Sequence, residues 1–212
     1  MNSFNNLKGK SISIEGGEGS GKGTLIESLK EYLKDKGIKA MFTREPGGVP
    51  IAEKIREIIV DIDNTEMTST TEMLLYASAR AQHLEQKVMP ILKAGNFVVF
   101  DRFVDSSYAY QGIARELGLK KVMLINEIAT QGFLPDKTII LDIEPEIGLE
   151  RINTNRRDEI NRLDMETIEF HKKVREGYKQ LKEIFPDRIV FVNANQDKEK
   201  VFQDVLKIIE EI

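Results

Sequence analysis

A glycine-rich loop between a predicted strand and a predicted helix constrains this chain more than any other feature. The loop GGEGSGKGT occupies residues 16–24 and matches the pattern G-x-x-x-x-G-K. Residues 11–15 before it carry isoleucine at alternate positions, and residues 24–36 after it repeat leucine with a helical period. In this arrangement the backbone N–H groups of the loop and the N-terminus of the helix point into one concavity, where a phosphate group can bind. We therefore favour a phosphate-binding loop over the alternative, a glycine-rich turn that binds no ligand. The predicted polyphosphate site consists of Gly16, Gly17, Glu18, Gly19, Ser20, Gly21, Lys22, Gly23 and Thr24.

The end of this loop departs from the strict pattern. Lys22 is placed to reach the β- and γ-phosphates of a nucleotide, but Gly23 follows it where a metal-binding hydroxyl is expected. Thr24 supplies a hydroxyl one position later. This GKGT form resembles nucleoside monophosphate kinases, and it leaves open whether Thr24 contacts magnesium directly or through water.

Strand and helix patterns alternate along the whole chain. Strands are predicted at residues 11–15, 39–45, 97–100, 138–141 and 188–192, and helices at 24–36, 51–60, 70–93, 163–185 and 198–212. The short apolar runs suit strands that are buried on both faces of a parallel sheet. We therefore predict an α/β protein with a three-layer P-loop kinase fold, in which helices flank a five-stranded parallel sheet. Ligands of such folds bind at the carboxyl ends of the strands.

Length and composition limit the domain organisation. With 212 residues, 41% hydrophobic and 31% charged, the chain can build one full core, so we expect a single domain over residues 1–212. A stretch rich in charged residues, from Arg151 to Arg175, interrupts the alternation of strands and helices. Residues 153–162 within it show neither a helical nor a strand period and are predicted as a loop. We interpret the segment at about 151–163 as a lid inserted in the domain, with a solvated loop as the alternative.

Charge and residue usage exclude several classes of protein. The net charge of −4 argues against a nucleic-acid binder. Cysteine is absent, which excludes disulfide scaffolds and thiolate metal sites. The chain shows neither an 18-residue apolar span nor a signal-peptide core, so we expect no membrane partner and a cytoplasmic location. The two histidines, His83 and His171, are interpreted as surface residues, His83 alternatively as a helix-capping one.

Further polar clusters follow the second and third predicted strands. The stretch TREPGG begins at Thr43, and the pair Asp101–Arg102 ends the third strand. Asp101 stands where a carboxylate would hold Mg²⁺ through water, and Arg102 could clamp a phosphate with two hydrogen bonds. A structural ion pair is the alternative for these two residues. The chain lacks the Asn-Lys-x-Asp guanine motif, which argues against a GTPase, and it is short for a motor ATPase.

Four stretches together resemble the thymidylate kinase (dTMP kinase) family. They are the glycine-rich loop, TREPGG at residues 43–48, DRFVDSSYAYQG at 101–112 and GFLPDKTIILD at 132–142, and the resemblance spans residues 11–194. It implies ATP-dependent phosphorylation of dTMP to dTDP, with ATP and Mg²⁺ as cofactors and a homodimer as the assembly. The isomer of the Glu45–Pro46 bond stays open at this point.

The resemblance also implies roles for individual side chains. The residues expected to bind dTMP are Glu18, Arg44, Glu45, Arg56, Tyr76, Arg80, Arg102, Ser107 and Gln111. The arginines Arg56 and Arg102 would face its phosphate, with Arg44 and Glu45 lining the same pocket. Tyr76 would stack on thymine and Arg80 would face a base carbonyl, one helical turn away. Ser107 and Gln111 would read the base edge, and Glu18 would approach the sugar 3′-hydroxyl.

The bacterial members of this family place a catalytic arginine in the lid. Residues 16–24 contain no arginine here, so the lid is expected to supply one. We predict Arg162 for this role, with Arg157 second, and a catalytic set of Lys22, Arg102 and Arg162. Another small-molecule P-loop kinase and a nucleotide-sensing module without turnover are the alternatives. The cluster Arg44, Arg56 and Arg102 favours a substrate that already carries phosphate.

Overall fold

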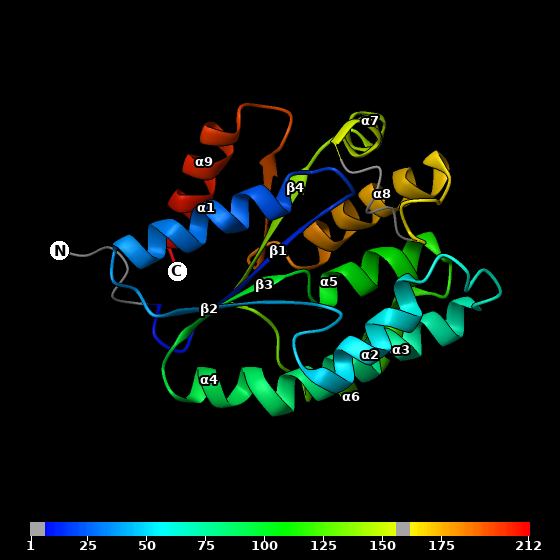
Figure 1. Ribbon diagram of the computed structural model, residues 1–212, viewed down its shortest axis with the longest axis horizontal. Helices are drawn as coiled ribbons and strands as arrows, with labels where there is room; N and C mark the ends of the chain where they lie inside the picture. Colours follow the sequence, from blue (N-terminus) through cyan, green and yellow to red (C-terminus); the bar gives the residue numbers. More distant parts are fainter. Residues whose placement is uncertain (1–6, 156–161) are drawn as a thin grey trace.

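Five parallel strands form one sheet at the centre of the computed structural model, which describes residues 7–155 and 162–212 (Figure 1). The strand order is β2-β3-β1-β4-β5. This confirms the predicted five-stranded parallel α/β fold. The strands are β1 (Ser11–Gly16), β2 (Ala40–Arg44), β3 (Phe97–Asp101), β4 (Lys137–Asp142) and β5 (Ile189–Asn193).

Helices connect successive strands as parallel pairing requires. The α-helices are α1 (Lys22–Asp35), α2 (Pro50–Val60), α3 (Ser69–His83), α4 (Met89–Lys93), α5 (Val104–Ser107), α6 (Leu119–Thr130), α7 (Pro145–Asn155), α8 (Ile168–Ile184) and α9 (Lys198–Glu210). Two π-helical segments, η2 (Leu84–Val88) and η3 (Tyr108–Ala114), continue α3 and α5. The predicted helix at 70–93 is thus present as α3, η2 and α4 in succession.

Two boundaries differ from the sequence-based expectation. Helix α7 extends to Asn155, so the predicted loop does not begin at residue 153. Residues 162–165 form a turn, and α8 begins only after Thr167, whose hydroxyl accepts a hydrogen bond from the backbone N–H of Phe170. A threonine cap of this kind defines the start of a helix more sharply than apolar periodicity does.

Each face of the sheet packs against its own helical layer. Helices α1 and α9 lie together on one face, where Leu29 and Val205 pack on Ile14 and Val99 (Figure 1). The other face carries Phe100 and packs on α4, α5, η3, α6 and α8. Side chains alternate across a strand, so the neighbours Val99 and Phe100 belong to different layers. Among the described residues, no helix combines the length and the apolar character needed to cross a membrane.

The sheet order brings the predicted polar clusters to one edge. Strand β1 lies between β3 and β4, and Ile14 is in register with Asp101, which is in turn in register with Arg44 of β2. The connection after β1 runs to β2 on one side of the sheet, and the connection after β3 runs to β4 on the other side, which creates a crevice at the carboxyl ends of these strands. The glycine-rich loop, the end of β2 and the end of β3 therefore meet there.

Candidate active site

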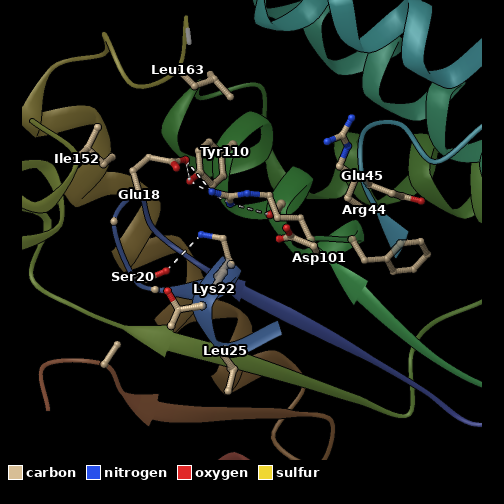
Figure 2. Close-up of a pocket in the computed structure, with 18 of the residues that line it drawn as sticks. Glu18, Ser20, Lys22, Leu25, Arg44, Glu45, Asp101, Tyr110, Ile152 and Leu163 are labelled. Carbon is tan, nitrogen blue, oxygen red and sulfur yellow. Dashed lines mark hydrogen bonds and ion pairs between the residues drawn. The ribbon is translucent and has the colours of Figure 1, made fainter. Parts of the chain in front are cut away.

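A cavity of about 890 Å³ opens at this edge of the sheet. Its walls come from the glycine-rich loop, the ends of β2, β3 and β5, and helices α2, α3, η3 and α9. Figure 2 shows Lys22 and Ser20 on one side of it, Arg44 and Glu45 on the other, and Asp101 between them. Most of the predicted site residues thus line one cavity, although they come from five separate stretches of chain, whereas Gly16, Gly17 and Arg162 do not line it.

The side chain of Lys22 is held by hydrogen bonds to earlier residues of its own loop. Its Nζ donates to the carbonyl oxygens of Gly16 and Gly17 at 3.0 and 2.9 Å and to Oγ of Ser20 at 3.2 Å. Burial lowers the pKa of Lys22 to about 8, with the charge of Arg102 adding to the shift and nearby carboxylates opposing it. An anion placed against this ammonium would raise the pKa of Lys22 again.

The loop is anchored by a contact between two glycines. Gly19 adopts a left-handed conformation with φ of 67°, and a Cβ there would lie 2.0 Å from the carbonyl oxygen of Gly148. The first turn of α7 therefore packs directly on the backbone of the loop. Only glycine permits this approach, which fixes where the predicted lid segment leaves the body of the protein.

Arg102 lies directly beside the glycine-rich loop. Its guanidinium donates to the carbonyl oxygen of Gly16 at 3.1 Å and forms an ion pair with Glu18 at 2.7 Å. Tyr110 joins the pair, because its hydroxyl lies 3.2 Å from Arg102 and donates to Glu18 at 2.8 Å. Burial alone would raise the pKa of Glu18, but the charges of Arg102 and Lys22 outweigh it and lower that pKa to about 2. Glu18 is therefore a carboxylate tied to Arg102.

Two further arginines stand on the opposite wall. Arg44 pairs with Glu53 at 2.9 Å, and Arg56 donates to the carbonyl oxygen of Pro46 at 3.1 Å. The Glu45–Pro46 bond that the sequence left open is cis. Both arginines line the cavity together with Arg102 and Asp101. The predicted arginine cluster, Arg44, Arg56 and Arg102, therefore lines a single cavity.

Arg80 is almost fully enclosed. It is 2% exposed, and its Nε donates to Glu45 at 2.7 Å while its guanidinium also donates to Ser107 at 3.0 Å and to Asn126. This set of partners gives Arg80 one fixed orientation at the cavity wall. Tyr76, one turn earlier, is half-buried and lines the same cavity.

The interpretation of both histidines as surface residues is wrong. His83 is 0% exposed, and its ring nitrogens lie 2.7 Å from Oγ1 of Thr43 and 2.9 Å from Glu45. His171 is 5% exposed and packs edge to face on Phe170. Each histidine directly adjoins a buried apolar residue of its helical segment, Leu84 for His83 and Phe170 for His171.

Glu72 binds several polar side chains beside the cavity, and of these only Gln111 lines it. It accepts hydrogen bonds from Gln111 at 2.8 Å, from Arg115 at 3.1 Å and from Arg162 at 2.5 Å. Arg162 also donates through Nε to the carbonyl oxygen of Ile59 at 3.0 Å. The predicted lid arginine therefore contacts α2 and α3 in this structure. Arg157, the second choice, lies outside the described residues, as do residues 156–161 of the predicted lid.

Sequence reasoning missed one end of the cavity. Leu25 and Ser28 of α1 line this end of the cavity. It is also lined by residues after β5 and on α9, namely Ala194, Gln196, Asp197, Lys198, Val201 and Phe202. The rule that ligands lie beyond the carboxyl ends of strands could have indicated them, because they directly follow the fifth predicted strand. Tyr110 was also missed as a partner of Glu18 and Arg102, since only the folded chain brings it to the loop.

The arrangement can hold two anionic groups next to each other. One subsite is the backbone of the glycine-rich loop with Lys22, and the other is formed by arginine side chains. Arg102 joins them, because it touches the loop at Gly16 while it lines the arginine cluster. Preorganised charges of this kind stabilise a transferring phosphoryl group.

Comparisons with known proteins agree with this geometry. A family model described as thymidylate kinase matches residues 14–205. A thymidylate kinase of Bacillus cereus (strain B4264) is 56% identical over 205 residues, covering 97% of this chain and 99% of that protein. One of Clostridium novyi (strain NT) is 52% identical over 198 residues, covering 93% and 97%. The crystal structure of thymidylate kinase from Ehrlichia chaffeensis matches with a TM-score of 0.77 at 26% identity, covering 94% of this chain and 97% of that one. On these grounds the chain belongs to the thymidylate kinase family.

Proposed function

We propose that this protein transfers the γ-phosphoryl group of ATP to dTMP in the cavity at the carboxyl edge of the sheet. The observation that carries the assignment is Arg102, which contacts the glycine-rich loop at Gly16 and lines the arginine cluster at the same time. A donor phosphate on the loop and an acceptor phosphate at the arginines would then be neighbours. Family membership gives the identity of the two substrates.

The reaction needs no general base. A phosphate oxygen of dTMP attacks the γ-phosphorus, the bond to the β,γ-bridging oxygen breaks, and dTDP and ADP are formed. The attacking oxygen is already an anion, so catalysis consists of alignment and charge neutralisation. We assign alignment of the acceptor to Arg56 and Arg102, and neutralisation of the moving charge to Lys22 and Arg162.

The donor set of the cavity fits a magnesium ion. Mg²⁺ prefers oxygen ligands and is often held by one or two carboxylates together with substrate phosphates. Asp101 provides a carboxylate at the end of β3, at the wall that also carries Lys22 and the hydroxyl of Thr24. The ion would neutralise charge on the β- and γ-phosphates.

The thymine site is assigned to the wall formed by α3 and η3. Tyr76 offers a ring for stacking, while Arg80 and Gln111 lie within the same wall and carry donors. Adenine would occupy the opposite end, among the residues after β5 and on α9. We keep the predicted lid over residues 151–163 and Arg162 as its catalytic arginine, with closure needed to carry that guanidinium from Glu72 toward the phosphates.

A coupled ADP-release assay across the four deoxynucleoside monophosphates and dUMP tests the assignment. We expect the highest kcat/KM with dTMP. Comparable turnover of another monophosphate would favour the broader kinase alternative, and the absence of ADP release with dTMP would favour the sensing module.

We propose further that the chain forms a homodimer through α3 and α6. Three large apolar side chains of these helices stand exposed: Leu74 at 46%, Leu124 at 58% and Ile128 at 69%. The two helices are adjacent, because Arg80 of α3 donates to Asn126 of α6. Light scattering should give a dimer mass for the wild type and a monomer mass for Ile128→Glu, and a wild-type monomer would refute the proposal.

A further inference from the structure

The backbone of Arg102 adopts an unusual conformation. Its φ is 64°, in the left-handed region that residues with a Cβ rarely enter. The backbone N–H of Arg102 donates to the carbonyl oxygen of Ile14 at 3.0 Å, which pins the residue on its N-terminal side. Such a conformation persists only where the surrounding structure holds it in place.

A buried carboxylate holds the other side of this residue. Glu15, near the end of β1, is 0% exposed, and its Oε1 accepts the backbone N–H of Phe103 at 2.6 Å. Its Oε2 accepts the hydroxyl of Ser106 at 2.5 Å and that of Tyr178 at 3.1 Å. The Ser106 hydroxyl in turn lies 3.3 Å from the guanidinium of Arg102. Glu15 thus contacts Phe103, which follows Arg102 in the sequence, and Ser106, which contacts the side chain of Arg102.

We propose that Glu15 is a positioning residue that fixes Arg102 in the orientation needed to bind the acceptor phosphate. Glu15 does not line the cavity and would not contact a substrate; it acts by accepting hydrogen bonds from Phe103 and Ser106. Tyr178 extends the same network to α8, the helix that follows the lid. The inference rests on the proposed role of Arg102 in the phosphate clamp.

The chemistry of this position supports the inference. Burial raises the pKa of Glu15 to about 7, and the charge of Asp105 adds to the shift, while hydrogen bonds from Ser106 and Phe103 and the charge of Arg102 oppose it. The ionised form of a carboxyl group is therefore unfavourable at this point of the core. Its presence is explained by the backbone N–H and the two hydroxyls that donate hydrogen bonds to it.

The test is the steady-state kinetics of Glu15→Gln. Glutamine keeps one acceptor for the Phe103 N–H but replaces the oxygen that accepts from Ser106 and Tyr178. We expect the KM for dTMP to rise about tenfold while the KM for ATP stays within about twofold. The matched control is Ser13→Ala, which alters a buried hydroxyl on the same face of β1 that contacts Thr138 at 3.0 Å. It should leave both KM values unchanged.

A double variant separates a positioning role from a general loss of structure. If Glu15 acts through Arg102, Glu15→Gln should add no further rise in the KM for dTMP when Arg102→Ala is already present. Independent, multiplying effects would overturn the inference. Arg102→Ala alone tests the underlying assignment: an unchanged KM for dTMP would refute the clamp itself. A raised KM there together with an unaffected Glu15→Gln would refute only the role of Glu15.

A second variant covers the case in which Glu15→Gln does not fold. Tyr178→Phe removes one donor to Glu15 at a position that does not line the cavity. We expect the KM for dTMP to rise about threefold with the KM for ATP unchanged. Identical KM values for dTMP in Tyr178→Phe and wild type would contradict the network.

Discussion

Nε of Arg80 lies 2.7 Å from Oε2 of Glu45, and each side chain is 2% exposed. The pair joins the end of β2 to α3 beneath the predicted thymine site. A buried ion pair of this kind is costly to break, because the remaining partner keeps its charge without compensation. We therefore expect stability and the proposed recognition of thymine to depend on the same two residues.

Glu45→Gln should reveal this dependence. We expect the free energy of unfolding to fall by about 3–5 kcal/mol, measured by urea denaturation followed by circular dichroism. The matched control is Glu53→Gln, which weakens the exposed pair with Arg44 and should change stability by less than about 1 kcal/mol. Equal losses in the two variants would contradict the argument from burial.

Arg162→Ala tests the lid arginine. If this guanidinium neutralises the transferring phosphoryl group, its removal should lower kcat by about 10²–10³, equivalent to about 3–4 kcal/mol. Lys173→Ala is the control, because Lys173 is a half-exposed cation on α8 that pairs with Glu116. A kcat of Arg162→Ala within about threefold of the wild type would remove Arg162 from the catalytic set.

Nucleotide binding should be linked to protonation of Lys22. Its pKa is lowered to about 8 by burial and by Arg102, so a growing fraction of free enzyme carries a neutral amine as the pH rises through that value. A bound polyphosphate restores the charge, and we expect proton uptake on ATP binding to increase between about pH 7 and about pH 9. Titration calorimetry in buffers of different ionisation enthalpy measures this uptake. Lys22→Arg keeps its charge throughout and should lack the increase.

Glu15 should make stability depend on pH near neutrality. Its folded pKa of about 7 lies above the ordinary glutamate value of 4.5, so the folded state holds a proton that the unfolded state has released between these two pH values. Its contribution to the free energy of unfolding therefore falls as the pH rises through this window, by about 3 kcal/mol in total. Denaturation of wild type and Glu15→Gln at about pH 5 and about pH 8 isolates the contribution. A difference between the two proteins that is the same at both pH values would contradict the assigned pKa.

The local parts of the architecture were predictable from the chain. The five strands, the glycine-rich loop and the helix containing Leu25, Leu29 and Leu33 rest on patterns within a few residues of each other. The clusters at Arg44 and Asp101 could be brought together because the carboxyl ends of parallel strands share one edge. The π-helical segment η3, which carries Gln111, was not predicted, since its turn does not follow the period of an α-helix.

Short-range periodicity in the chain was enough to predict the strands, the phosphate loop and the edge of the sheet at which the polar residues gather, because the carboxyl ends of parallel strands share one edge. The pairing of side chains from distant segments became visible in the folded protein alone. His83 became a buried partner of Thr43 and Glu45, and Glu15 met Tyr178 across 163 positions of the chain. Such partners depend on how two packed layers face each other, and no pattern within one segment carries that information.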